Sequence, residues 1–163
     1  MKEKHSEHAT LAQPVPKGFH SITPYLAIDG AEEWLEFAEN AFDAQTTFLL
    51  KHESGKDAGK IMHATIKIGD SNIMFSEIMD NYPAVTAMLY LYVDDADRVY
   101  KQAIDAGAES IREPRNEFYG DRAGCVKDKW NNTWWIATQI EDVEGTELKK
   151  RAREFDKNYS EKK

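Results

Sequence analysis

The side chains of this chain that could do chemistry are few: one histidine within a strand pattern, one arginine beside a glycine turn, and a group of tryptophans. His63 lies in the alternating segment KIMHATIKI (60–68), and its imidazole could hydrogen-bond a ligand or act as a general base. A structural histidine within a hairpin is the alternative. Arg122 follows Gly120 and Asp121, and its guanidinium could hold a carboxylate or phosphate through two parallel hydrogen bonds. An Asp121–Arg122 pair that fixes the turn fits the sequence equally well.

The other reactive or aromatic groups fit an interior better than a catalytic centre. Cys125 is the single cysteine, and it lies in mid-strand without a nearby histidine or helix N-terminus that would activate its thiol. We therefore expect Cys125 to be structural. Trp34 falls on the apolar stripe of a helix, and Trp134 should face the helices, so both are predicted core residues. No glycine-rich phosphate loop is present, and no Ser-His-Asp triad is recognisable from spacing.

The composition excludes several classes of protein. The 163 residues suit one domain or two small halves that share a core. No run of about 18 apolar residues exists that could cross a membrane. The net charge of -8 argues against nucleic acid as a partner and leaves room for cationic ligands. The N-terminus lacks the apolar region of a secretory signal, and a single cysteine forms no intrachain disulfide, so we expect a cytoplasmic protein without nucleic-acid or membrane partners.

Two runs of strand, helix and three further strands follow one another along the chain. Apolar spacing near 3.6 residues predicts helices, and alternation with period two predicts strands. The first run comprises ITPYLAID (22–29), the helix AEEWLEFAENAF (31–42), TTFLLKH (46–52), KIMHATIKI (60–68) and SNIMFSE (71–77). The second comprises TAMLYLYV (86–93), the helix DDADRVYKQAIDAG (94–107), ESIREPRNEF (109–118), GDRAGCVKD (120–128) and NTWWIATQ (132–139). A charged helix, VEGTELKKRAREFDKNY (143–159), follows.

The two runs are related in sequence, which indicates an internal duplication. When the chain is slid by 65 positions, PYLAIDGAEEWLEFAENA lies over LYLYVDDADRVYKQAIDA, and Tyr25 falls on Tyr90. Two unrelated strand–helix units could share such a pattern, but we favour duplication. We therefore predict an α+β fold of two tandem βαβββ modules. The domain spans 21–143, with modules at about 21–80 and 86–140, a flexible N-terminal tail at 1–20, and a C-terminal helix and tail at 144–163.

Strand alternation divides the side chains between the two faces of each predicted sheet. One face is aliphatic and should pack beneath the helices. The opposite face carries aromatic, sulfur and polar groups: Tyr25, His63, Thr65, Lys67, Met88, Tyr90 and Tyr92. Such a mixture suits a partly wet cavity for a ligand. A solvent-exposed face or a dimer interface would show the same pattern, and these alternatives stay open.

Four strings of this chain carry a resemblance to a known family: ITPYLAIDGAEEWLEFAENAF (22–42), GKIMHATIKIGDSNIMFSE (59–77), YLYVDDADRVYKQAIDAGAE (90–109) and YGDRAGCVKDKWNNTWWIAT (119–138). They resemble the glyoxalase/bleomycin-resistance/dioxygenase, or vicinal oxygen chelate, superfamily, and within it the PhnB-like branch. The resemblance implies eight strands in two four-stranded sheets around a glyoxalase-like cleft, a small-molecule ligand and a homodimer. It also places Arg122 at the entry to a strand that lines the cleft.

The resemblance further assigns the positions at which metal-dependent members carry their ligands. Those members use a His at each first strand and a Glu at each last strand. The corresponding positions here are Thr23, Met74, Met88 and Trp135. A hydroxyl, two thioethers and an indole cannot build a site for a hard divalent ion, so we predict neither a metal nor another cofactor. Trp135 would face the cleft and could stack on a planar ligand. A residual metal route through His63 and Glu77 looks strained, since alternation puts Glu77 on the other face of its strand.

Three classes of function fit these observations. We favour a metal-free protein that binds a small aromatic or cationic molecule, with drug sequestration as one version. The second is a lyase, isomerase or dioxygenase, with a metal or with His63 and Arg122 as its working residues. The third is a non-catalytic interaction module, for which the charged C-terminal helix is the motive. The sequence leaves open whether the modules pack within one chain or swap between chains.

Overall fold

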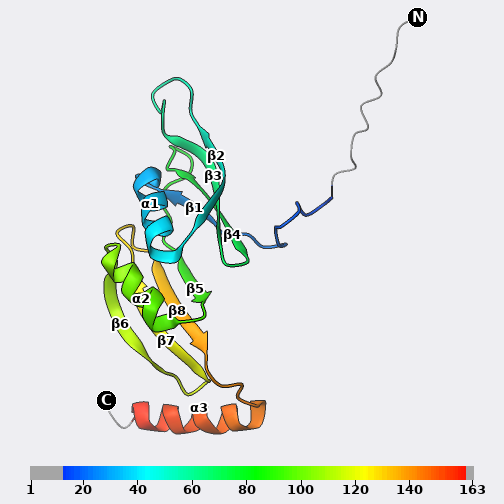
Figure 1. Ribbon diagram of the computed structural model, residues 1–163, viewed down its shortest axis with the longest axis vertical. Helices are drawn as coiled ribbons and strands as arrows, with labels where there is room; N and C mark the ends of the chain where they lie inside the picture. Colours follow the sequence, from blue (N-terminus) through cyan, green and yellow to red (C-terminus); the bar gives the residue numbers. More distant parts are fainter. Residues whose placement is uncertain (1–12, 161–163) are drawn as a thin grey trace, which may run out of the picture.

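A computed structural model of the chain describes residues 13–160 and shows two βαβββ modules arranged along one axis, followed by a C-terminal helix (Figure 1). The first module consists of β1 (Tyr25–Ile28), α1 (Ala31–Phe42), β2 (Gln45–Lys51), β3 (Ile61–Ile68) and β4 (Ser71–Glu77). The second consists of β5 (Met88–Tyr92), α2 (Ala96–Asp105), β6 (Glu109–Asn116), β7 (Asp121–Lys127) and β8 (Thr133–Gln139). Helix α3 spans Gly145–Ser160. The predicted α+β fold of two tandem modules is confirmed.

Each module forms one four-stranded mixed sheet, and the two sheets have the same topology. The strand orders are β1-β4-β3-β2 and β5-β8-β7-β6. The first strand of each module is therefore an edge strand, and it pairs in parallel with the last strand of its module. Tyr25 pairs with Met74, and Tyr90 pairs with Trp135, so the residues superposed by the sequence repeat occupy equivalent places.

The hydrophobic core lies between the helices and the sheets and runs through both modules without interruption. Trp34 on α1 packs against Phe75 of β4, with ring centroids 4.8 Å apart. Phe42 at the end of α1 packs against Trp134 of the second module at 4.3 Å. Trp34 and Trp134 are fully buried, as predicted. Helices α1 and α2 also pack against each other, so that they cover the same side of the molecule (Figure 1).

Each helix of the modules begins at an acidic side chain, although the two carboxylates come from different places in the chain. Asp95 caps α2 from within its own turn, because its carboxylate accepts the backbone N–H of Arg98 at 3.0 Å. The cap of α1 comes from the end of β4. Buried Glu77 accepts the N–H groups of Gly30 at 3.1 Å and Ala31 at 3.0 Å. Both carboxylate oxygens of Glu77 thus bind the N-terminus of α1, and Glu77 does not form a metal site with His63.

A bulge in β3 makes one detail of the predicted faces wrong. Leu50 and Lys51 of β2 pair with His63 and Ile61, so Met62 is an extra residue between the two pairs. An extra residue reverses the alternation of side chains on one side of it. Strict alternation through residues 60–68 would place Ile61 on the same face as His63 and Met62 on the aliphatic face. Instead, Ile61 is buried and Met62 is exposed.

The segments at either end add little to the core. Of the predicted N-terminal tail, residues 1–12 lie outside the described residues, and residues 13–20 contain neither helix nor strand. The Gly18 carbonyl accepts a hydrogen bond from Asn72 Nδ2 at 2.6 Å. Helix α3 lies across the far end of the second sheet and has no buried residue (Figure 1). Within residues 13–160, no helix is long and apolar enough to cross a membrane.

Candidate functional site

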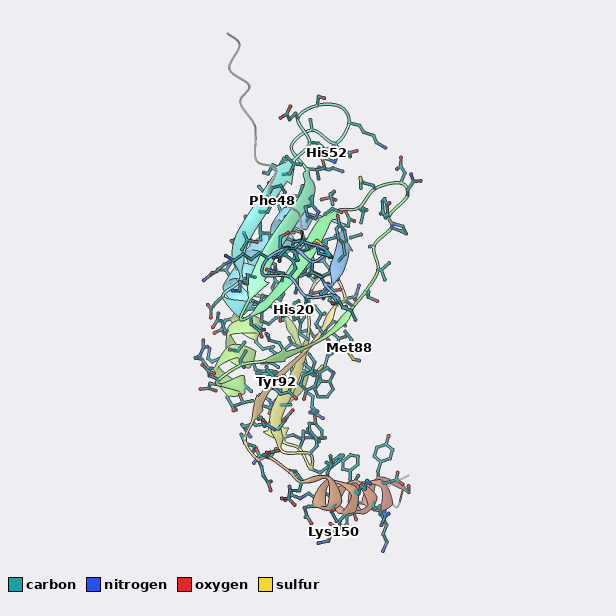
Figure 2. All side chains as sticks on the ribbon, turned by 90° about the vertical axis from the view of Figure 1, so that its right-hand side faces the viewer. His20, Phe48, His52, Met88, Tyr92 and Lys150 are labelled. Atoms are coloured by element: carbon teal, nitrogen blue, oxygen red, sulfur yellow. The ribbon has the colours of Figure 1, made fainter. Side chains whose placement is uncertain are left out.

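The sheet faces that point away from α1 and α2 carry most of the side chains predicted for a ligand site. Figure 2 shows the molecule after a quarter turn from Figure 1 and labels Phe48, Met88 and Tyr92. The large side chains of these faces that are exposed are Tyr25, Phe48, Leu50, Met88, Tyr90 and Tyr92. Contiguous exposed apolar side chains of this kind mark sites of ligand or protein binding.

In the first module, the four strands contribute one residue each to a row across the sheet. The row runs Tyr25, Met74, Thr65 and Phe48. His63 contacts the rings of Tyr25 and Phe48 at centroid distances of 5.7 and 5.9 Å, and its Nδ1 lies 3.5 Å from Tyr25 Oη. The structure thus brings His63 and Tyr25 together and adds Phe48, which the sequence did not identify. Thr65 is only 4% exposed and offers a ligand little surface.

The second module has the equivalent row, with different chemistry. It runs Tyr90, Trp135, Cys125 and Arg112. The Tyr90 ring lies parallel to the Trp135 ring within 9°, at a centroid distance of 6.1 Å. From the other side of the row, Arg112 reaches across the small Cys125 and places Cζ 4.4 Å from the Trp135 centroid. Trp135 therefore lies between Tyr90 and Arg112 along the row and stays partly exposed, and the stacking of a ligand on its ring stays a prediction.

Cys125 is buried beneath this stack, as its predicted structural role requires. Burial raises the pKa of its thiol. A thiol with a raised pKa is a poor nucleophile at neutral pH, because only the thiolate attacks. The chemistry of this row therefore belongs to the aromatic rings and to Arg112.

A buried carboxylate fixes the exposed tyrosines of the second module. Asp121 is 3% exposed, and its Oδ2 accepts hydrogen bonds from Tyr90 Oη at 3.0 Å and Tyr92 Oη at 2.9 Å. Tyr90 Oη also lies 3.3 Å from Tyr119 Oη. Burial raises the pKa of Tyr90, and its hydrogen bonds to Tyr119 and Asp121 act in the same direction. The hydrogen bond to Asp121 likewise raises the pKa of Tyr92, so both rings are neutral and held in place.

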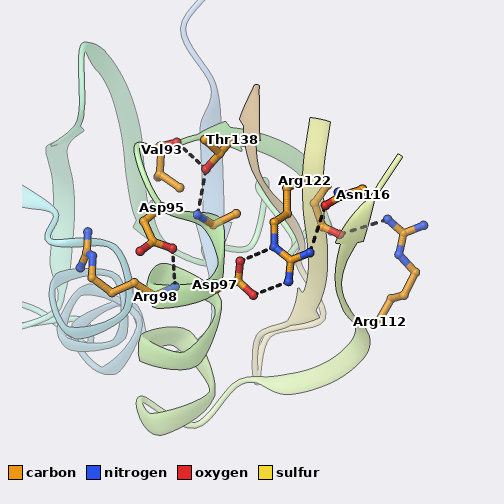
Figure 3. A network of polar contacts seen from close by, with 10 residues as sticks. Val93, Asp95, Asp97, Arg98, Arg112, Asn116, Arg122 and Thr138 are labelled. Atoms are coloured by element: carbon orange, nitrogen blue, oxygen red, sulfur yellow. Dashed lines mark hydrogen bonds and ion pairs between the residues drawn. The ribbon is translucent and has the colours of Figure 1, made fainter. Parts of the chain in front are cut away.

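The structure places Arg122 away from the other candidates. It neighbours Asp121 in β7 but points to the opposite face, toward α2. Its guanidinium binds both carboxylate oxygens of Asp97, with Nη2 2.6 Å from Oδ1, and donates to Asn116 Oδ1 at 3.1 Å (Figure 3). The hydrogen bond between Arg122 and Asp97 raises the pKa of Arg122 and lowers the pKa of Asp97. Arg122 is thus used to hold α2 on the sheet, and the Asp121–Arg122 turn pair is not formed.

The remaining candidates do not gather at one point. Met88 is 74% exposed at the start of β5. Lys67 is exposed near the end of β3 and contacts none of the other candidates through a hydrogen bond or ion pair among residues 13–160. Thr23 precedes β1, where its hydroxyl donates to the His20 carbonyl at 3.4 Å. In the part of the chain that the structure describes, no three His, Cys, Asp or Glu side chains form a group that could hold a metal ion. The absence of a metal stays a prediction.

A cavity of about 580 Å³ adjoins the tyrosines at the boundary between the modules. Tyr90 and Tyr92 line it from β5, and Thr23, Pro24 and Ile73 line it from the first module. Its volume lies within the range of small-molecule sites in proteins. A separate cavity of about 630 Å³ beneath the linker between the modules contains none of the candidate residues.

These features define a tandem βαβββ protein with an aromatic face on each sheet. The family model of the Glyoxalase/Bleomycin resistance protein/Dioxygenase superfamily matches residues 18–136, and the chain belongs to this superfamily. The predicted family is thereby confirmed. Uncharacterized proteins of Mycobacterium bovis and Mycobacterium tuberculosis are 26% identical to the chain over 139 residues, which cover 78% of this chain and 89% and 79% of theirs.

Solved structures of low sequence identity share the fold. TioX from Micromonospora sp. ML1 has a TM-score of 0.60 at 16% identity, covering 77% of this chain and 100% of that one. A Bacillus cereus PhnB protein, described as a putative 3-demethylubiquinone-9 3-methyltransferase, has a TM-score of 0.55 at 19% identity and covers 73% and 99%. A glyoxalase/bleomycin resistance protein/dioxygenase family enzyme from Burkholderia phytofirmans has a TM-score of 0.56 at 18% identity and covers 71% and 95%. These similarities concern the fold alone.

Proposed function

We propose that the protein binds a small, largely planar molecule on the aromatic faces of its sheets, without using a metal. The observation that carries this proposal is the set of exposed rings that internal contacts hold in place. Asp121 fixes Tyr90 and Tyr92, and His63 lies between Tyr25 and Phe48. Rings that are already ordered lose little conformational entropy on binding, and they provide large apolar contact areas.

Calorimetric titration of the wild-type protein with a panel of planar aromatic and cationic molecules tests this function. We expect at least one planar compound to bind, and we expect Tyr92→Ala to weaken it about tenfold through the loss of ring contact. Tyr82→Ala is the matched control, because Tyr82 is also 62% exposed but lies in the linker, outside both faces. If no compound of the panel binds, the proposal is wrong.

We also propose that the protein is a homodimer in which each copy covers the open faces of the other. In a single chain both faces lie away from the helices, and Met88 and Tyr92 are 74% and 62% exposed. A two-fold axis would set the first-module face of one copy on the second-module face of its partner. Such an arrangement forms two identical closed sites and buries the exposed rings.

Sedimentation equilibrium tests the homodimer. We expect the mass of two chains at micromolar concentration, and we expect Met88→Glu to weaken association, because a carboxylate on the covered face would be desolvated. Met79→Glu introduces the same charge in the linker and should leave association unchanged. A wild-type mass of one chain would exclude the arrangement.

The position of His63 favours catalysis on the bound molecule as a second candidate function. Its imidazole is on the open face of the first sheet, beside the Tyr25 hydroxyl, where it could move a proton to or from a ligand. A lyase or isomerase would need such a base, whose removal typically costs about 100-fold or more in rate. His63→Ala, with folding checked by circular dichroism, should then abolish turnover of a bound compound but retain its binding. Unchanged turnover in this variant would remove His63 from the mechanism.

A further inference from the structure

We propose that the molecule bound by this protein carries a carboxylate, and that Arg112 is the residue that binds it. This inference rests on the proposed small-molecule site and adds the chemical class of its ligand. Arg112 was not singled out by the sequence, yet it is the cationic member of the row that crosses the second sheet. Its contacts, its unpaired nitrogen and the charges around it each support this role.

The contacts of Arg112 fix the orientation of its guanidinium and leave it accessible from the open face of the second sheet. One side of the guanidinium plane lies on the Trp135 ring. Nη2 forms an ion pair with Glu117 Oε1 at 2.5 Å and donates a hydrogen bond to the Ala123 carbonyl at 3.4 Å. The Arg112 side chain is 26% exposed. A planar guanidinium that is held in this way is suited to bind a carboxylate through parallel N–H···O bonds with little loss of entropy.

The donors of Arg112 are not all used. An arginine side chain has five N–H groups, and both the ion pair of Arg112 with Glu117 and its hydrogen bond to Ala123 are made by Nη2. Its Nε is buried and has no acceptor. Among residues 13–160, no other buried side-chain nitrogen or oxygen lacks a hydrogen-bond partner. A buried donor without an acceptor is unfavourable, and each such group in a native structure needs an explanation. A ligand carboxylate on the open face would accept hydrogen bonds from the N–H groups of Arg112 that reach this face.

The charges around Arg112 favour an anionic ligand over a cationic one at this position. Oε1 of Glu117 is shared between Arg112 and Arg115, whose Nε lies 3.0 Å away. Two guanidinium groups thus share one carboxylate, so Glu117 neutralises only one of them. The other acidic side chain of this face, Asp121, accepts hydrogen bonds from Tyr90 and Tyr92 and forms no ion pair with Arg112.

The two modules differ at this position, which gives the ligand an orientation. Phe48 ends the row of the first sheet as Arg112 ends the row of the second. In the proposed dimer, an apolar row of one copy would therefore face a row with a cationic end in its partner. A planar apolar body with a carboxylate at one end satisfies both rows.

The test compares naphthoate with naphthamide, which have the same rings but differ in charge, by calorimetric titration of the full chain. We expect naphthoate to bind wild type about tenfold more tightly than naphthamide, as charge-assisted hydrogen bonds imply. Arg112→Met should remove this preference and leave the affinity for naphthamide unchanged. Arg115→Met is the comparison variant: it removes the other cation that shares Glu117, but Arg115 is 56% exposed and is not a member of the row, so the preference should fall less than in Arg112→Met.

A second measurement on the wild type keeps the inference testable if Arg112→Met does not fold. Arginine Nε–H signals can be followed by nitrogen–proton NMR, and the Arg112 signal should shift with naphthoate but not with naphthamide. Equal binding of the two probes, or a preference that survives Arg112→Met, would overturn the role of Arg112 while the proposed function stands. If neither probe binds, this inference is wrong, whereas the proposed function is decided by the wider panel of planar aromatic and cationic compounds.

Discussion

At the scale of single residues, the candidate site depends on polar atoms with fixed partners. Asp121 of β7 is the best example, since its carboxylate joins two exposed tyrosines of the edge strand β5, on the far side of β8. The two phenols donate their protons to it, and the Tyr90 oxygen also lies 3.3 Å from Tyr119 Oη. The site is therefore better prepared for binding than for nucleophilic attack, which agrees with the raised pKa of Cys125.

The pH dependence of the two phenols is a direct test of this arrangement. Tyr90 and Tyr92 should ionise at higher pH than an ordinary tyrosine, because their pKa values are raised in the folded state. The folded protein holds these protons more tightly than the unfolded chain, so the stabilisation is present below about pH 10 and is lost as the pH rises further. Ultraviolet titration of phenolate should show a late step that Asp121→Asn shifts to lower pH and Tyr92→Phe reduces. Ionisation of all seven tyrosines in one ordinary step would contradict the structure.

The sequence identified some of these residues and could not identify others, for physical reasons. Tyr25 and Tyr90 were found because the duplication superposes them in strands with clear alternation. Phe48 lies in the run TTFLL, where apolar residues do not alternate, so its face was not defined. The slide of 65 positions places Phe48 over Glu113 rather than Arg112, and the register shifts of β2 and β6 account for the difference. Asp121 and Arg122 are adjacent, and only the pairing of β7 decides which of them faces the tyrosines.

At the scale of elements, the boundaries were most predictable where local chemistry sets them. Helix α1 spans the predicted residues 31–42, and β4 spans the predicted residues 71–77. Gly30 before α1 and Asp43 after it both have left-handed backbone conformations, which set the two ends of the helix. Strand β6 runs through Pro114 without a break, because the register shift between Arg112 and Arg115 accommodates the proline at the sheet edge.

The turn that leads into β7 requires glycine at position 120. Gly120 has φ of 99°, and a Cβ there would lie 2.3 Å from the Glu141 carbonyl oxygen. Gly107 has a similar φ of 104° but nothing within 4 Å of its Cβ position. Gly107→Ala should therefore cost only about 1–2 kcal/mol of backbone strain, whereas Gly120→Ala should cost about 3 kcal/mol or more. Urea unfolding of the two variants measures the difference, and equal losses would show that the contact with Glu141 is unimportant.

Helix α3 should be dispensable for the folding of the two modules. None of its residues is buried, and its main links to the second module are the pair of Arg151 with Glu141 and the contact of Phe155 with Phe118 at 5.0 Å. Exposed ion pairs contribute little to stability. A chain that ends at Val143 should keep the circular-dichroism spectrum of the strands and nearly the same midpoint of urea unfolding. A large fall in that midpoint would mean that α3 is an integral part of the fold.

At the scale of the whole molecule, the two modules are joined through one buried carboxylate. Asp128 is 2% exposed, and its Oδ2 accepts the indole N–H groups of Trp34 in the first module at 3.3 Å and Trp134 in the second at 3.1 Å. The same oxygen accepts Asn132 Nδ2 at 2.9 Å. Oδ1 accepts the backbone N–H groups of Trp130 and Asn132 at 3.0 and 2.8 Å. Because the hydrogen bonds of Asp128 and the hydrophobic core are shared by both modules, the modules should unfold in one transition.

Asp128→Ala should therefore destabilise the whole chain and not only the hairpin that carries it. The substitution leaves buried donors from both modules without an acceptor, and we expect a loss of about 3–5 kcal/mol in the free energy of unfolding. Asp142→Ala, in the exposed segment before α3, removes the same group and should cost little. Urea unfolding followed by tryptophan fluorescence and by circular dichroism measures both the loss and the coincidence of the two signals. If Asp128→Ala lost stability in only one of two separate transitions, the modules would be independent units, and the joint would serve their orientation rather than their folding.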